Sequence, residues 1–188
     1  MWVMIAGLVI FFGVHSVRMI AGPFRDAQLA TNEGRWKGLY SLASLLGFAL
    51  IILGWWVYRA VAPEVFTSPS WGHPVTLLLV FLAFISLVSA YTPAGYIRRT
   101  VQHPFLTGVA LWALGHLLVN GDLASLLVFG AFLLYAVVDR VAVIFRPPPA
   151  MGAPSIRGDI VAVVVGFLLY AAFGLWVHPW LFGPVPFL

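Results

Sequence analysis

The sequence predicts an all-α integral membrane protein built as a bundle of six transmembrane helices. Of its 188 residues, 62% are hydrophobic and only 9% are charged, whereas roughly a quarter of the residues of a soluble protein carry charge. Six long stretches contain no Asp, Glu, Lys or Arg, and about 20 apolar residues suffice for one helix to cross a bilayer. Because these stretches cover most of the chain, we expect a single transmembrane domain over residues 1–188 and no separate soluble domain.

Prolines mark the ends of the predicted helices. We expect spans at about 2–21, 38–60, 74–92, 104–120, 123–144 and 159–181, with the prolines at or between their ends, where a helix tolerates them. The first charge is Arg18, so residues 2–20 lack the basic segment of a signal peptide and are expected to stay as a span. The connection at 22–37 mixes charges with aromatic residues and is expected to lie half-submerged. Residues 147–155 are expected to form an extended linker.

The orientation follows from the basic residues, nine of which come after the first, third and fifth predicted spans. They are Arg18, Arg25, Arg35, Lys37, Arg98, Arg99, Arg140, Arg146 and Arg157. Only Arg59 lies on the other side, so the positive-inside rule places both termini on the periplasmic side of a bacterial inner membrane. The net charge of +4 then reflects orientation towards anionic membrane lipid, and we expect no nucleic-acid partner.

Histidines are the candidate site residues. The chain has no cysteine, which excludes disulfides, thiolate metal sites and a cysteine nucleophile. The five histidines are His15, His73, His103, His116 and His178. His73 and His178 each precede a proline at an outward helix end and are expected to be interfacial. His103 begins a span on the cytoplasmic side, where a capping role and a functional role both stay open.

His15 and His116 differ from the others because they lie inside predicted spans, where polar groups are costly. Each could be an ordinary interhelical hydrogen-bond partner. Together they also fit the two axial ligands of a haem b held in a helical bundle. His15 lies closer to the cytoplasmic surface than His116 by about 5–10 Å of helical rise. If helix tilt does not absorb this difference, His15 and His103 become the better-matched pair.

Further residues complete the predicted cofactor site. Arg18 follows His15 by about one turn and could hold a haem propionate or extend to the interface. Tyr40 belongs to the thin polar set near these histidines, and Trp112 is deep enough to line a cavity. Residues 120–122 read as a tight turn in which Asp122 caps the following helix.

Three segments resemble the NnrU family of bacterial membrane proteins: HSVR at 15–18, GRWKGLYSLASLLG at 34–47 and QHPFLTGVALWALGHLLVNGD at 102–122. That family was named for an association with nitrite and nitric oxide reduction in denitrifying bacteria. It is similar to the plant and cyanobacterial 15-cis-zeta-carotene isomerase, an integral membrane haem b enzyme. This resemblance implies that His15 and His116 are the haem ligands. The isomerase has a cysteine, proposed to exchange as ligand, where this chain has Ala113, so a thiolate switch is impossible here.

Three functions stay open at this point. The first is a cis–trans isomerase-like activity on a carotenoid or similar lipid-soluble polyene. The second is a non-enzymatic haem sensor or accessory factor linked to nitrite and nitric oxide reduction. The third is a structural or transport protein without a cofactor, although the broken helices typical of transporters are not evident. A distant likeness of residues 103–108 to membrane methyltransferases is disfavoured, because Gln102 replaces their arginine and 139–159 lacks their cofactor-binding residues.

Overall fold

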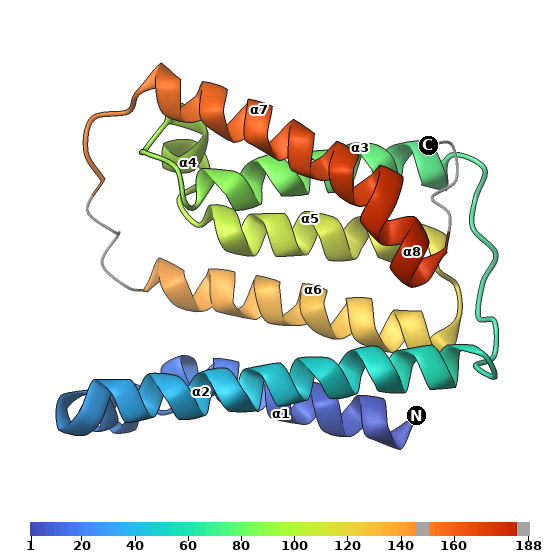
Figure 1. Ribbon diagram of the computed structural model, residues 1–188, viewed down its shortest axis with the longest axis horizontal. Helices are drawn as coiled ribbons and strands as arrows, with labels where there is room; N and C mark the ends of the chain where they lie inside the picture. Colours follow the sequence, from blue (N-terminus) through green and yellow to red (C-terminus); the bar gives the residue numbers. More distant parts are fainter. Residues whose placement is uncertain (146–150, 184–188) are drawn as a thin grey trace. The chain divides into compact units, whose positions relative to one another are not determined.

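The computed structural model describes residues 1–145 and 151–183, and most of these residues are helical (Figure 1). The elements are α1 (Trp2–Ile20), α2 (Gly22–Arg59), α3 (Gly72–Ser89), α4 (Tyr96–Val101), α5 (Pro104–Val119), α6 (Leu123–Ile144), α7 (Ile156–Ala172), the π-helical turn η1 (Phe173–Val177) and α8 (His178–Phe182). Within the described residues no β-strand forms, and an isolated bridge pairs Glu64 with Asp122. The prediction of an all-α protein is confirmed.

The helices identify a multi-pass membrane protein. Within the described ranges, five helical segments are long and apolar enough to cross a bilayer: α1, α2, α3, α6 and the continuous segment Ile156–Phe182. The apolar helix α5 has 16 residues and is shorter than these five. Five spans therefore follow from length and composition.

The helix α2 begins at Gly22, whereas the sequence predicted a span from 38 after a separate connection at 22–37. The backbone of Asn32 is non-helical, with φ −159° and ψ 94°, so α2 consists of two helical segments joined at a kink. The Asn32 side chain accepts a hydrogen bond from the Arg35 N–H at 2.9 Å, which is how a helix N-cap works. The segment before Asn32 is rich in helix-forming Ala, Gln and Leu. Local capping therefore keeps the connection helical.

Other boundaries differ less. The spans predicted at 104–120 and 123–144 match α5 and α6 within a residue. The short helix α4 was not predicted, and the last helix contains the π-helical turn η1. Arg146 and the proline run at 147–149, on which the orientation and linker predictions partly depend, lie outside the described residues.

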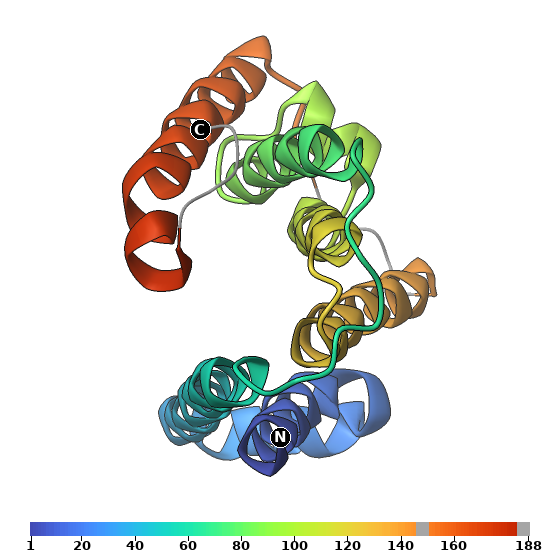
Figure 2. The same cartoon turned by 90° about the vertical axis from the view of Figure 1, so that its right-hand side faces the viewer.

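The described chain divides into two compact units. The first contains residues 1–66 and 121–131, and the second contains 67–120 and the described residues from 132 onwards. In the first unit α1 and α2 lie side by side and antiparallel (Figures 1 and 2). In the second unit α3 packs against both α5 and α7 (Figure 2).

Glycines let α1 and α2 approach backbone to backbone. The contacting pairs are Met4 with Gly54, Gly7 with Ile51, and Phe11 with Gly47. A Cβ atom added at Gly7 would lie 2.6 Å from the Ile51 nitrogen. Cβ atoms in real proteins essentially never come this close to another atom. Small residues that permit such close approach are typical of helix pairs in membranes, where van der Waals contact drives association. These pairs fix the register of the two helices.

The helices α3 and α5 use the same device in the second unit. Gly115 lies against Thr76, and Gly108 lies against Ala83. The Thr76 hydroxyl donates to the Gly115 carbonyl of α5 at 2.7 Å. The Gly72 carbonyl of its own helix lies 2.9 Å from the same hydroxyl oxygen. An interhelical hydrogen bond to a backbone carbonyl therefore joins the two helices at Gly115.

The contact at Gly7 yields a test of this packing. Gly7→Ala should lower the free energy of unfolding by about 1–3 kcal/mol, as overpacking does, because its Cβ meets the backbone of α2. The matched control is Gly13→Ala on the same helix, where an added Cβ meets nothing within 4 Å. The measurement is the midpoint of thermal unfolding in detergent. Equal midpoints for the two variants would contradict the packing described for α1 and α2.

Candidate functional site

His15 lies on α1 beside α2. Its Nδ1 atom is 2.7 Å from the carbonyl oxygen of Phe11, four residues earlier. The imidazole stacks on the Phe11 ring at 4.1 Å between centroids, and the Tyr40 ring of α2 lies at 5.3 Å. Phe11 in turn rests against Gly47. The glycine contact thus places His15 against Tyr40, which brings together two of the predicted cofactor residues.

His116 lies near the end of α5 in a matching arrangement. Its Nδ1 atom is 2.8 Å from the carbonyl oxygen of Trp112, again four residues earlier. The Trp112 and His116 rings lie 5.2 Å apart, and Trp112 makes an edge contact at 5.4 Å with Phe132 of α6. The Asn120 amide donates to the His116 carbonyl at 2.9 Å. Trp112, also predicted for the cofactor site, therefore contacts one of the two predicted ligands.

The two Nδ1 contacts have a chemical consequence. A carbonyl oxygen only accepts hydrogen bonds, so Nδ1 carries the hydrogen in both rings, and the neutral imidazole has its lone pair on Nε2. Histidines that ligate metals use this arrangement, because the bond made by the second nitrogen fixes the tautomer and the ring orientation. In the neutral form of His15 and of His116, Nε2 is then the nitrogen without a hydrogen.

The remaining predicted residues lie elsewhere. Arg18 is exposed in the last turn of α1. His103 is the N-cap residue of α5, at the opposite end of that helix from His116. His178 also places Nδ1 near a carbonyl, that of Gly183 at 3.0 Å, but it does so at the start of the short helix α8. What distinguishes His15 and His116 is a position in an apolar helix with an aromatic residue four positions earlier.

Each member of the predicted ligand pair belongs to its own unit, His15 to the first and His116 to the second. Within residues 1–145 and 151–183, no three His, Asp or Glu side chains gather into a metal-binding group. A haem iron takes only two axial ligands from the protein. The side chain of Ala113, one turn before His116, is fully buried.

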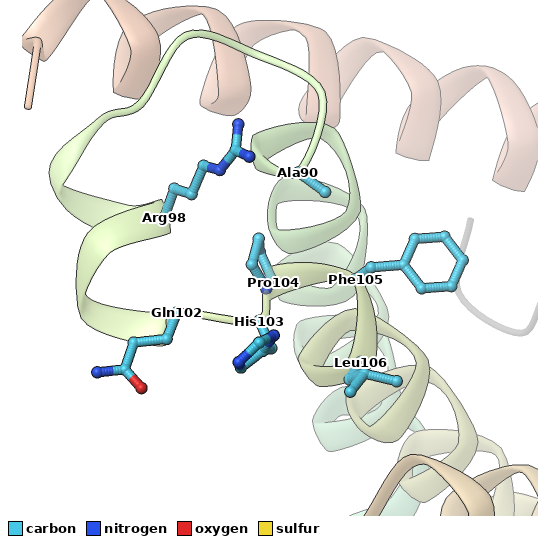
Figure 3. Close-up of a pocket in the computed structure, with 7 residues that line it drawn as sticks. All are labelled: Ala90, Arg98, Gln102, His103, Pro104, Phe105 and Leu106. Atoms are coloured by element: carbon cyan, nitrogen blue, oxygen red, sulfur yellow. The ribbon is translucent and has the colours of Figure 1, made fainter. Parts of the chain in front are cut away.

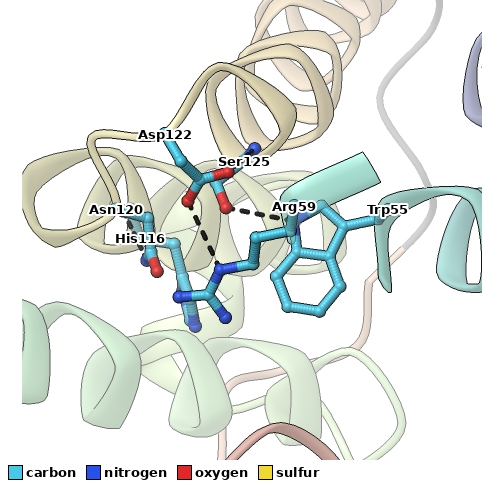
Figure 4. Close-up of polar contacts among 6 residues, drawn as sticks. All are labelled: Trp55, Arg59, His116, Asn120, Asp122 and Ser125. Atoms are coloured by element: carbon cyan, nitrogen blue, oxygen red, sulfur yellow. Dashed lines mark hydrogen bonds and ion pairs between the residues drawn. The ribbon is translucent and has the colours of Figure 1, made fainter. Parts of the chain in front are cut away.

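Asp122 organises a polar network in the first unit (Figure 4). One carboxylate oxygen accepts from the Ser125 N–H at 2.8 Å, so the predicted cap of α6 is confirmed. The other lies 3.4 Å from Nε of Arg59, whose guanidinium sits 4.9 Å above the Trp55 ring. The Trp55 indole donates to the Ser125 hydroxyl at 3.0 Å. This network joins the end of α2 to the start of α6.

Sequence reasoning named Trp112 but missed Phe11, the aromatic residue against which His15 stacks. Phe11 and Trp112 each precede a histidine by four residues, which places them one helical turn away on the same face. That spacing was readable in the sequence. The pairing of Arg59 with Asp122 was not, because it joins distant segments.

The family model of the NnrU protein matches residues 3–186, nearly the whole chain. The chain belongs to the NnrU family. This match confirms the family resemblance carried by the segments around His15 and His116. No curated protein and no solved structure matches the chain significantly.

The Asp122 network provides a second test. Asp122→Ala should cost about 1 kcal/mol of unfolding free energy, because it removes the N-cap of α6. Asp122→Asn should cost less, because asparagine also caps helices. It does lose the ion pair with Arg59, but that partly exposed pair contributes at most about 1 kcal/mol to the unfolding free energy. Thermal unfolding midpoints of both variants check this order, and a larger loss for Asn than for Ala would refute the capping role.

Proposed function

We propose that this NnrU family member is a haem b protein of the bacterial inner membrane, with His15 and His116 as the two axial ligands. The observation that supports this most directly is the shared Nδ1-to-carbonyl contact, at 2.7 Å for His15 and 2.8 Å for His116. It leaves the Nε2 lone pair of each neutral ring as the ligating atom. Iron binding requires the neutral form of each ring, in which Nε2 has the lone pair.

The proposed membrane arrangement has six spans with both termini in the periplasm. The sixth span is α5, whose 16 residues reach about 24 Å at 1.5 Å per residue. This is shorter than the roughly 30 Å hydrocarbon core, and local thinning of the bilayer accommodates such a mismatch. The distribution of basic residues sets the orientation.

The residues around the two ligands have distinct proposed roles. Phe11 and Tyr40 flank His15, and Trp112 flanks His116, so each imidazole lies against at least one aromatic ring. They exclude water and hold each ring in place. Arg18, exposed one turn after His15, would pair with a haem propionate. Bound haem supplies Lewis-acid or one-electron chemistry, and the protein residues supply its position and its dry surroundings.

The proposed activity is a cis–trans isomerisation of a carotenoid or a similar lipid-soluble polyene. Helices with large exposed apolar side chains, such as Leu42 and Leu45 on α2, present an apolar surface through which such a substrate reaches the site from the bilayer. The apolar environment suits a substrate that has no charged group.

Ala113 favours a second candidate function. The resembling isomerase has an exchangeable cysteine at this position, whereas here the side chain is a fully buried methyl group. A chain without that cysteine keeps fixed histidine ligands, which suits a haem sensor or an accessory factor linked to nitrite and nitric oxide reduction. Both candidate functions require the same haem.

Haem binding predicts a spectrum that depends on two histidines. Protein purified after expression with ample haem should show a Soret band in ferric and ferrous forms. His15→Ala and His116→Ala should each remove or strongly shift it, because each deletes an axial ligand. His73→Ala is the matched control, since His73 lies at the start of α3. His103→Ala tests the alternative ligand pair and should leave the band unchanged. A colourless wild-type protein would contradict the proposal.

Isomerase activity is tested separately. Haem-loaded protein in detergent or lipid vesicles, oxidised and reduced in turn, should convert 15-cis-zeta-carotene to the isomer with a trans central double bond, and chromatography follows the conversion. The His116→Ala variant should lose the conversion. Absence of conversion in both redox states, with the Soret band intact, would rule out this substrate and favour the accessory function.

A further inference from the structure

A small open pocket of about 200 Å³ lies in the second unit where α3, α4 and α5 meet (Figure 3). Its lining has two chemically different parts. Arg98, Gln102 and His103 form a polar part, while Phe105 and Leu106 form an apolar part. In Figure 3, Phe105 extends from α5 on the side away from α4. A pocket with one polar and one apolar wall fits an amphipathic ligand.

The charge in this pocket is positive and unmatched. Arg98 is half-buried and donates from Nη1 to the Thr92 carbonyl at 3.1 Å. Within the described residues it makes no ion pair with a carboxylate. A guanidinium has five donors in a rigid fork that suits phosphate geometry. The pocket also opens at the first turn of α5, and a helix N-terminus favours negative charge. Both features favour an anion.

The helix that carries Arg98 is held firmly. The buried Asp159 carboxylate of α7 accepts hydrogen bonds from the Tyr96 and Ile97 N–H groups, at 2.9 and 3.0 Å. These bonds fix the start of α4 and satisfy the charge of Asp159 locally. Because α4 has only six residues, this anchor sets the direction in which Arg98 extends. The cation is therefore positioned before any ligand binds.

The turn between α4 and α5 carries backbone strain. Gln102 has φ 62° and ψ −44°. Among the described residues other than glycine, it alone has a positive φ. Such conformations cost free energy and persist where the surroundings enforce them, often at ligand sites. Here the strained turn leads the chain from Arg98 on α4 directly to His103 and Phe105 on α5.

Exposed aromatic residues indicate where the pocket meets the membrane. Tyr91 is 80% exposed, Tyr96 57% and Phe105 48%. Tyrosine and tryptophan gather at membrane–water interfaces, where an apolar ring and a polar end are both satisfied. The polar wall of the pocket then lies at the depth of lipid headgroups, and its apolar wall lies at the start of the acyl chains.

We propose that this pocket binds an anionic phospholipid. Arg98 pairs with a phosphate whose charge the rest of the headgroup leaves unbalanced, whereas the choline of phosphatidylcholine neutralises it. Gln102 lies beside the headgroup, and Phe105 and Leu106 contact the acyl chain. Free phosphate shares the charge but lacks the chain, so it binds far more weakly. This site is separate from the proposed haem ligands and does not depend on them.

Native mass spectrometry of the full-length protein tests this proposal. Protein in mild detergent is offered phosphatidylglycerol, phosphatidylcholine or inorganic phosphate. The wild type should retain phosphatidylglycerol in preference to the other two. Arg98→Gln should weaken phosphatidylglycerol binding by about tenfold or more, the scale of a charge-assisted hydrogen bond.

The matched control is Arg99→Gln, which removes the same charge from the neighbouring exposed residue that does not line the pocket. It should retain wild-type binding. Gln102→Glu keeps the side-chain size and adds a negative charge beside the headgroup, so it should also lose phosphatidylglycerol. This second variant tests the proposal if Arg98→Gln does not fold. Equal losses for Arg98→Gln and Arg99→Gln would overturn the proposal. The proposal would also be overturned if the wild type bound phosphatidylcholine as tightly as phosphatidylglycerol, or if it bound inorganic phosphate as tightly as either lipid.

Discussion

Backbone contact through glycine is the constraint on which the rest of this structure depends. Inside a bilayer the hydrophobic effect does not draw helices together, so close packing and interhelical hydrogen bonds must do so. Gly7, Gly47 and Gly54 provide that contact between α1 and α2. Between α3 and α5, Gly108 and Gly115 provide it, with the Thr76 hydroxyl adding a bond to a backbone carbonyl. Each contact fixes the register of one antiparallel pair.

Register then determines the surroundings of the two histidines. His15 lies one turn beyond the contact of Phe11 with Gly47, and this places its ring against Tyr40. His116 directly follows Gly115, which rests on Thr76. Each imidazole satisfies one nitrogen within its own helix, through the carbonyl four residues earlier. A carbonyl of its own helix thus orients each imidazole. At His15 the neighbouring helix α2 adds the Tyr40 ring, whereas Trp112 at His116 belongs to α5 itself.

Much of the fold was predictable from hydropathy and proline positions, because a bilayer requires long uninterrupted apolar helices. The bounds of α5 and α6 and the capping role of Asp122 were predicted correctly. The kink at Asn32 and the helix α4 were missed. The first involves one hydrogen bond from Arg35 to Asn32 and the second two hydrogen bonds from α4 to Asp159, and hydropathy reveals neither.

The candidate site was predictable in part. Depth along the helices singled out His15 and His116, and the structure brings Tyr40 and Trp112 to them. The tautomer was not predictable, since it follows from which ring nitrogen faces a carbonyl. The pocket at Arg98 was not predictable either, because it requires the strained turn at Gln102.

Electron paramagnetic resonance of the ferric protein, prepared with ¹⁵N-labelled histidine, tests the central claim most directly. Two histidines donating Nε2 to one iron predict a low-spin six-coordinate haem, with hyperfine coupling to two imidazole nitrogens. In His15→Ala and in His116→Ala, coupling to one imidazole should remain. A high-spin ferric haem in the wild type, or coupling that persists unchanged in either variant, would contradict the account.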